Sequence, residues 1–169
     1  MKIMNIRRAI QKDKNKVNDL LSQVLEIHAH IRPDIFISGT TKYTDEELDE
    51  MFLDDSKPVY VAVDENDEVT GYAFCQIREQ PFSNNMVPFK SMFIDDLCVD
   101  SSIRGAGIGK QLFEFVKSEA KRIGCYEVTL NVWKGNDSAR SFYEKLGMKP
   151  KETQMEYILT SSSLEENGD

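Results

Sequence analysis

The sequence is poor in cysteine and contains fewer basic than acidic residues. Its three cysteines, Cys75, Cys98 and Cys125, lie far apart and form no C-x-x-C pair, so they offer neither a disulfide framework nor the ligand spacing of a metal site. The 21 Lys and Arg residues are outnumbered by 29 Asp and Glu, a net charge of −8, which disfavours general attraction to nucleic-acid phosphates. We therefore expect a protein of a reducing cytoplasm that binds no metal and has neutral or cationic partners.

Long apolar runs are also missing. Residues 1–11 contain no apolar signal core, and no run approaches the roughly 20 residues that cross a bilayer, so export and membrane insertion are both disfavoured. Hydrophobic residues at 40% and charged residues at 30% argue against disordered, collagen-like and coiled-coil chains. With 169 residues, the chain has the size of one ordinary globular domain.

The spacing of apolar residues predicts strands and helices that follow one another along the chain. Neither a repeat nor a linker interrupts them, so we expect one α/β domain over residues 1–160 with a mixed sheet, and a polar tail over residues 161–169. Strands are expected at residues 2–8, 59–63, 69–77, 92–99, 127–132 and 155–159, and helices at residues 13–33, 44–52, 110–123 and 137–146.

A glycine-rich turn joins one of these strands to a helix. Three glycines, Gly105, Gly107 and Gly109, allow successive amide N–H groups to point outward, and the helix that follows adds its positive dipole end, so the turn suits a pyrophosphate. The Walker pattern is absent, because Lys110 is followed by Gln111 rather than by a hydroxyl residue. The dinucleotide fingerprint also fails, since Lys110 stands where its last glycine belongs. A tight strand-to-helix connection without a ligand is the alternative.

What remains is the pattern R-x-x-G-x-G, formed by Arg104, Gly107 and Gly109 directly after the strand at residues 92–99. This pattern resembles the pyrophosphate-binding motif of the GNAT acetyltransferase superfamily. Residues 130–148 contain Asn136 and the pair Phe142-Tyr143 at the spacing of that family's second cofactor motif. The resemblance covers residues 92–148.

The resemblance implies a single-domain GNAT fold, in which helices flank a mixed, mostly antiparallel sheet whose fourth and fifth strands splay apart. The slot between those strands would hold the pantetheine of acetyl-CoA, the acetyl donor. The residues that would contact this cofactor are Leu97, Cys98, Val99, Arg104, Gly105, Ala106, Gly107, Ile108, Gly109, Lys110, Asn136 and Tyr143. An N–H group of residues 97–99 would stabilise the oxyanion.

The resemblance also suggests the residues that move protons. Tyr143 would protonate the departing thiolate, although packing of the helix alone would also explain a tyrosine there. Asn136 either caps a helix or binds pantetheine amides, and the two roles are compatible. Asp95 and Asp96 are adjacent carboxylates on an apolar strand, where charge is unfavourable unless a cleft is near. We expect Asp95 to act as the base and Asp96 to orient the substrate, while purely structural roles for both stay open.

The acceptor site is less well defined. His28 and His30 lie about 200° apart around a helix and so cannot share a metal ion, but His28 is a candidate for the substrate mouth. Residues 45–50 are strongly acidic; they form either a solvated face or a surface that attracts a cationic acceptor.

Together, these features predict transfer of an acetyl group to the primary amine of a polyamine- or aminoglycoside-like molecule, by direct attack in a ternary complex. Acetylation of protein N-termini or lysines is one alternative, and a CoA-binding sensor without activity is another. Members of this family are commonly dimers, so a homodimer is also possible.

Overall fold

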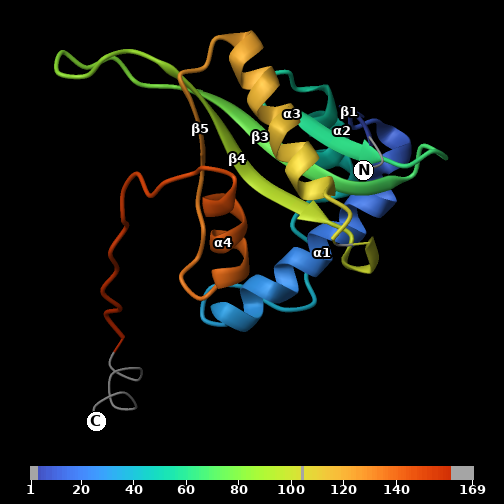
Figure 1. Ribbon diagram of the computed structural model, residues 1–169. Helices are drawn as coiled ribbons and strands as arrows, with labels where there is room; N and C mark the ends of the chain where they lie inside the picture. Colours follow the sequence, from blue (N-terminus) through green and yellow to red (C-terminus); the bar gives the residue numbers. More distant parts are fainter. Residues whose placement is uncertain (1–3, 104, 161–169) are drawn as a thin grey trace. The chain divides into compact units, whose positions relative to one another are not determined.

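The computed structural model describes residues 4–103 and 105–160 (Figure 1). The chain divides into two compact units, Met1–Asp137 and Ser138–Asp169. The first unit contains the sheet and helices α1 to α3, and the second contains nearly all of α4 and the chain beyond it.

One sheet runs through the first unit. In the described residues it has five strands in the order β1-β2-β3-β4-β5. Strands β1 to β4 pair antiparallel, whereas β5 runs parallel to β4, which confirms the mixed, mostly antiparallel sheet. From β1 to β5 the strands are Asn5–Arg8, Val59–Val63, Val69–Glu79, Lys90–Val99 and Glu127–Leu130.

The helices of the first unit are α1 (Lys14–Ile31), α2 (Asp45–Leu53) and α3 (Ile108–Ile123), with short 3₁₀ helices η1 (Gln11–Asp13) and η2 (Ser101–Ile103). α2 begins with a capping box, in which Thr44 Oγ1 accepts a hydrogen bond from Glu47 N–H at 3.1 Å and Glu47 Oε2 accepts one from Thr44 N–H at 2.7 Å. α3 ends at Gly124, as expected. No helix of the described residues combines the length and apolar character needed to cross a membrane.

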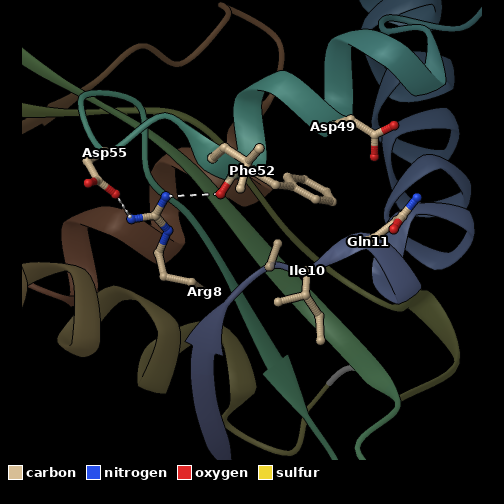
Figure 2. A pocket seen from close by; sticks show the side chains of 8 residues that line it. Arg8, Ile10, Gln11, Asp49, Phe52 and Asp55 are labelled. Atoms are coloured by element: carbon tan, nitrogen blue, oxygen red, sulfur yellow. Dashed lines mark hydrogen bonds and ion pairs between the residues drawn. The ribbon is translucent and has the colours of Figure 1, made fainter.

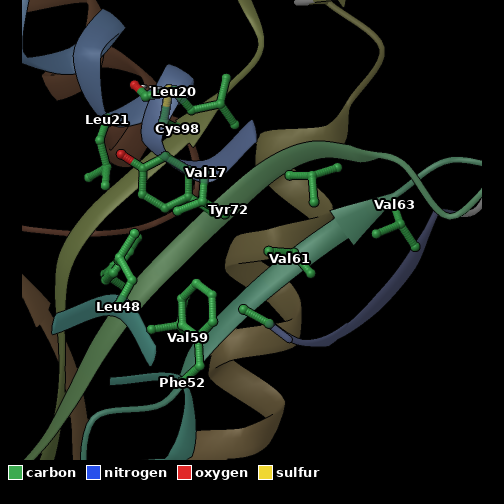
Figure 3. Close-up of a cluster of buried hydrophobic side chains, with 13 residues drawn as sticks. Val17, Leu20, Leu21, Leu48, Phe52, Val59, Val61, Val63, Tyr72 and Cys98 are labelled. Carbon is green, nitrogen blue, oxygen red and sulfur yellow. Dashed lines mark hydrogen bonds between the residues drawn. The ribbon is translucent and has the colours of Figure 1, made fainter. Parts of the chain in front are cut away.

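The sheet is packed between helices, and the alternation of β2 explains how. Val59, Val61 and Val63 point toward a buried cluster that also contains Val17 and Leu20 of α1 (Figure 3). Tyr60 points the opposite way, where its ring meets Phe115 of α3 at 5.1 Å. Because successive strand residues face opposite sides of a sheet, an uninterrupted apolar run is the expected pattern for a strand buried on both faces.

Strands β4 and β5 stay together for only a short distance. Their pairing runs from Ser91 opposite Glu127 to Ile94 opposite Leu130; β5 ends there, while β4 continues to Val99. The register between β3 and β4 shifts at the same point, because Cys75 faces Ile94 and Phe74 faces Asp96. Asp95 is therefore the extra residue of a β-bulge, which bends a strand and increases its twist.

The second unit corrects one prediction. α4 (Asp137–Lys145) forms as expected, but the strand predicted at residues 155–159 does not, since the described chain after α4 forms no strand. Met155, Tyr157 and Leu159 are 84%, 77% and 87% exposed. Apolar residues do alternate over residues 155–159, but a strand also needs a neighbouring strand to satisfy its backbone hydrogen-bonding groups.

Candidate active site

The glycine turn has the backbone geometry that an anion site requires. Gly105 and Gly107 have φ values of 94° and 78°, in the left-handed region that favours glycine. α3 begins at Ile108, and its first intrahelical bond joins Gln111 N–H to the Gly107 carbonyl at 3.1 Å. The N–H groups of the first helical turn therefore have no acceptor within the helix, which fits a diphosphate. Arg104, predicted to contact the cofactor, lies outside the described residues.

Asp100 holds the chain in place just before this turn. Its carboxylate accepts hydrogen bonds from Ser102 N–H at 3.0 Å and Ser102 Oγ at 2.9 Å, and it also pairs with Lys16 of α1. The Lys16 hydrogen bond, followed by the Ser102 N–H bond, lowers the pKa of Asp100 to about 2. This buried carboxylate was missed in the sequence, because nothing local marks its partner on α1.

The other predicted cofactor contacts on β4 follow the bulge. Leu97, Cys98 and Val99 pair with Ala73, Tyr72 and Gly71 of β3. Cys98 is buried, and its sulfur lies 3.8 Å from the Leu20 carbonyl oxygen of α1. Its side chain thus belongs to the core, and any contact with a ligand lying beside β4 would involve its main chain.

Asp95 binds a cation from the connection between α1 and α2. Its Oδ2 accepts a hydrogen bond from Lys42 Nζ at 2.9 Å. The Lys42 ammonium also lies 5.2 Å from the ring centre of Tyr43. An ammonium held by one carboxylate and one aromatic ring therefore sits at the bulge.

Asp96 has different surroundings, although it is the next residue. Its Oδ2 accepts a hydrogen bond from the Tyr72 hydroxyl at 2.6 Å. Burial raises the pKa of Asp96 to about 6, and the Tyr72 bond and the charge of Lys42 keep that pKa from rising further. Near neutral pH, this carboxylate is therefore a proton acceptor of moderate strength.

Three aromatic rings form a cluster in the same unit, and one of them, His28, is close enough to Lys42 for that charge to act on it. The His28 and Phe36 ring centres are 5.1 Å apart, and those of Phe36 and Trp133 are 5.5 Å apart. Burial, then the charge of Lys42, lowers the pKa of His28, which makes its imidazole neutral at pH 7. The fold thus brings His28 near the Lys42–Asp95 pair, while Lys42 and Phe36 were not anticipated.

The second cofactor motif is divided between the two units. Asn136 directly precedes α4, and its N–H donates to the Trp133 carbonyl at 3.0 Å. Tyr143 lies on α4, where its ring meets Phe142 at 5.0 Å. Their roles toward a cofactor stay predictions. The described residues contain no group of three or more side chains suited to a metal ion.

A hollow of about 540 Å³ lies elsewhere, between β1 and α2 (Figure 2). Arg8 spans its edge by donating to Asp55 Oδ1 at 3.1 Å and to the Phe52 carbonyl at 3.2 Å. Of the residues singled out in the sequence, its lining contains only Asp49, from the acidic residues 45–50. Arg8 there ties the end of α2 to the sheet.

Comparison with known proteins identifies the family and fold of the chain. The acetyltransferase (GNAT) family model matches residues 23–148. The chain is 34% identical to glucosamine 6-phosphate N-acetyltransferase of Arabidopsis thaliana, over 70% of this chain and 80% of that protein. It is 31% identical to the peptidyl-lysine N-acetyltransferase YjaB of Escherichia coli, over 68% of this chain and 64% of that protein. The crystal structure of a mutant BH1408 protein from Bacillus halodurans superposes with a TM-score of 0.88, at 34% identity over 93% of this chain and all of the other.

Proposed function

The chain belongs to the GNAT acetyltransferase family, and on this premise we propose that it acetylates the primary amine of a small cationic molecule, polyamine- or aminoglycoside-like, by direct attack in a ternary complex. The family uses acetyl-CoA as its acetyl donor. The observation that carries the choice of acceptor is the ion pair at the bulge, where Asp95 already binds an alkylammonium group, that of Lys42.

The donor would be held by main-chain groups. The turn at residues 105–110 offers N–H groups to the diphosphate, and residues 97–99 of β4 offer main-chain groups to the pantetheine. The support for this arrangement is that β5 ends at Leu130, which leaves those β4 residues without a paired strand on that side among the described residues.

For the acceptor, we assign the two aspartates the reverse of the roles expected from the sequence. Asp96 is proposed as the base, because burial raises its pKa to about 6, close to the pH at which a base works well. Asp95 is proposed to bind the incoming ammonium, because it is exposed and already binds one. Orientation by one carboxylate and proton removal by its neighbour would then occur at the same bulge.

Isothermal calorimetry and a thiol-release assay test the function in sequence. Acetyl-CoA is expected to bind with a Kd on the order of micromolar and to raise the melting temperature. Free thiol should then appear with at least one amine among polyamines, aminoglycosides, glucosamine 6-phosphate and lysine peptides. Binding without thiol release from any amine would indicate a CoA sensor, and a lack of binding would refute the donor assignment.

Tyr143→Phe tests the proposed acid. Removing the phenol proton is expected to lower kcat by roughly a hundredfold while changing the acetyl-CoA Kd little, because the ring and its packing are retained. Steady-state kinetics and calorimetry measure the two effects. Phe142→Leu on the same helix serves as the control, and a Tyr143→Phe enzyme with normal kcat would leave the tyrosine a packing residue.

We also propose that two copies associate through residues 153–160. The support is the exposed, alternating apolar set Met155, Tyr157 and Leu159, since apolar patches of this kind favour association. Light scattering should give the dimer mass for the parent chain and the monomer mass after all three are changed to Ser. A monomeric parent chain would contradict this proposal.

A further inference from the structure

Lys42 stands where the acceptor is proposed to bind. Its side chain is 44% exposed, and its Nζ lies 2.9 Å from the carboxylate of Asp95, the extra residue of the bulge. Asp96 is close enough for its charge to act on Lys42, and Lys42 in turn acts on His28. These are the groups that would surround the ammonium of an added amine.

We propose that Lys42 is itself an acetyl acceptor, modified within its own chain, and that it competes with added amines for Asp95. This inference rests on the proposed function, because it uses the same donor and the same base. It extends that function from an external amine to a modification site in the connection between α1 and α2.

Lys42, Asp96 and acetyl-CoA together account for every bond and proton of the transfer. The Lys42 ammonium gives one proton to Asp96, and its Nζ forms a bond to the acetyl carbon as the bond from that carbon to sulfur breaks. After the bond forms, Nζ loses a second proton and the departing thiolate takes up one, while Asp96 releases the first proton to solvent. The net result is one N-acetyl-lysine, one CoA thiol and one proton, with no change of oxidation state.

Modification would alter how the site binds its acceptor. An acetylated lysine has no charge, so its ion pair with Asp95 is lost and that carboxylate becomes available to another ammonium. Lys42 therefore acts both as a competitor before modification and as a residue whose modification opens the site. An added amine that binds Asp95 should slow the labelling of Lys42.

The test is to incubate the full chain with acetyl-CoA and map acetylated lysines by peptide mass spectrometry over time. Lys12 is the matched control, because it is 54% exposed and also pairs with an aspartate, Asp67. Uncatalysed acetylation should label Lys12 at least as fast as Lys42. The proposal expects Lys42 to be labelled about tenfold faster or more, because it is held at the reacting centre.

Three further measurements separate this result from its alternatives. Labelling within one chain has a rate independent of protein concentration, whereas labelling between molecules slows on dilution. Asp95→Asn should reduce labelling of Lys42 and leave Lys12 unchanged, and Lys42→Arg should remove one acetyl group from the intact mass.

Equal rates at Lys42 and Lys12, or slowing on dilution, would overturn the inference. If thiol release from added amines persists in that case, the proposed function survives. If the chain neither binds acetyl-CoA nor acetylates any amine, both fail together.

Discussion

Replacement of Asp96 by Asn is expected to lower kcat by roughly a hundredfold to ten-thousandfold, the range that general-base catalysis contributes. The asparagine keeps the size of the side chain and can still bond to Tyr72, but it cannot accept a proton from the acceptor ammonium. Acetyl-CoA affinity should hardly change, because the proposed donor site is formed by main-chain groups further along β4 and at the glycine turn. Steady-state kinetics with saturating amine, together with calorimetry, measure both quantities.

The pH dependence of kcat provides a second test of whether Asp96 is the base. Burial raises the pKa of Asp96 from 3.8 to about 6, so the carboxylate becomes protonated, and inactive as a base, as the pH falls through 6. The kcat of the parent enzyme should therefore fall by about tenfold per pH unit below that value, which gives the pH profile an acidic limb. The Asp96→Asn variant should lack this limb. Because the Tyr72 hydrogen bond lowers the pKa of Asp96, Tyr72→Phe should move the limb to higher pH.

Asp95→Asn is the matched control for Asp96→Asn. It should mainly raise the KM for a cationic amine and keep the acidic limb, because the proposed base is unchanged. If Asp95→Asn abolishes the limb and Asp96→Asn does not, the base is Asp95, as first expected from the sequence.

Replacement of Gly107 by Val is expected to weaken acetyl-CoA binding by about tenfold or more. Gly107 has a φ of 78° and directly precedes α3. A β-branched residue at such an angle costs about 1–3 kcal/mol, and this strain is relieved when the turn moves and its N–H groups no longer converge. An affinity loss of about 1.4 kcal/mol corresponds to tenfold. Calorimetry measures the Kd, and thermal unfolding measures the loss of stability.

Gly124→Val provides the comparison. Gly124 has a φ of 91° at the opposite end of the same helix, so the substitution imposes similar strain where no ligand is proposed. Both variants should be less stable than the parent chain, but only Gly107→Val should bind acetyl-CoA more weakly. Equal affinities for the two variants would place the diphosphate elsewhere.

Local features were predictable because their causes lie within a few residues. Thr44 and Glu47 bond to each other's N–H groups across three positions, and the glycines at residues 105–109 need no distant partner to form a turn. The hairpin of β2 and β3 likewise follows from two apolar runs on either side of a polar turn.

Features that depend on distant partners were missed. Lys42 and Asp95 are 53 residues apart in the chain, and no local pattern relates them. The bulge that separates the roles of Asp95 and Asp96 is a property of the register between β3 and β4. The predicted strand at residues 155–159 failed for the same reason, since propensity is local whereas pairing needs a second strand.

The sequence by itself thus determined the order of the helices and of the strands up to residue 130, the glycine-rich turn and the family. Only the tertiary structure decided which carboxylate is the less exposed, which one binds an ammonium, and that the ammonium comes from Lys42. The reason is physical: backbone conformation responds to neighbouring residues, whereas a side chain's charge state and partners depend on what packing brings around it.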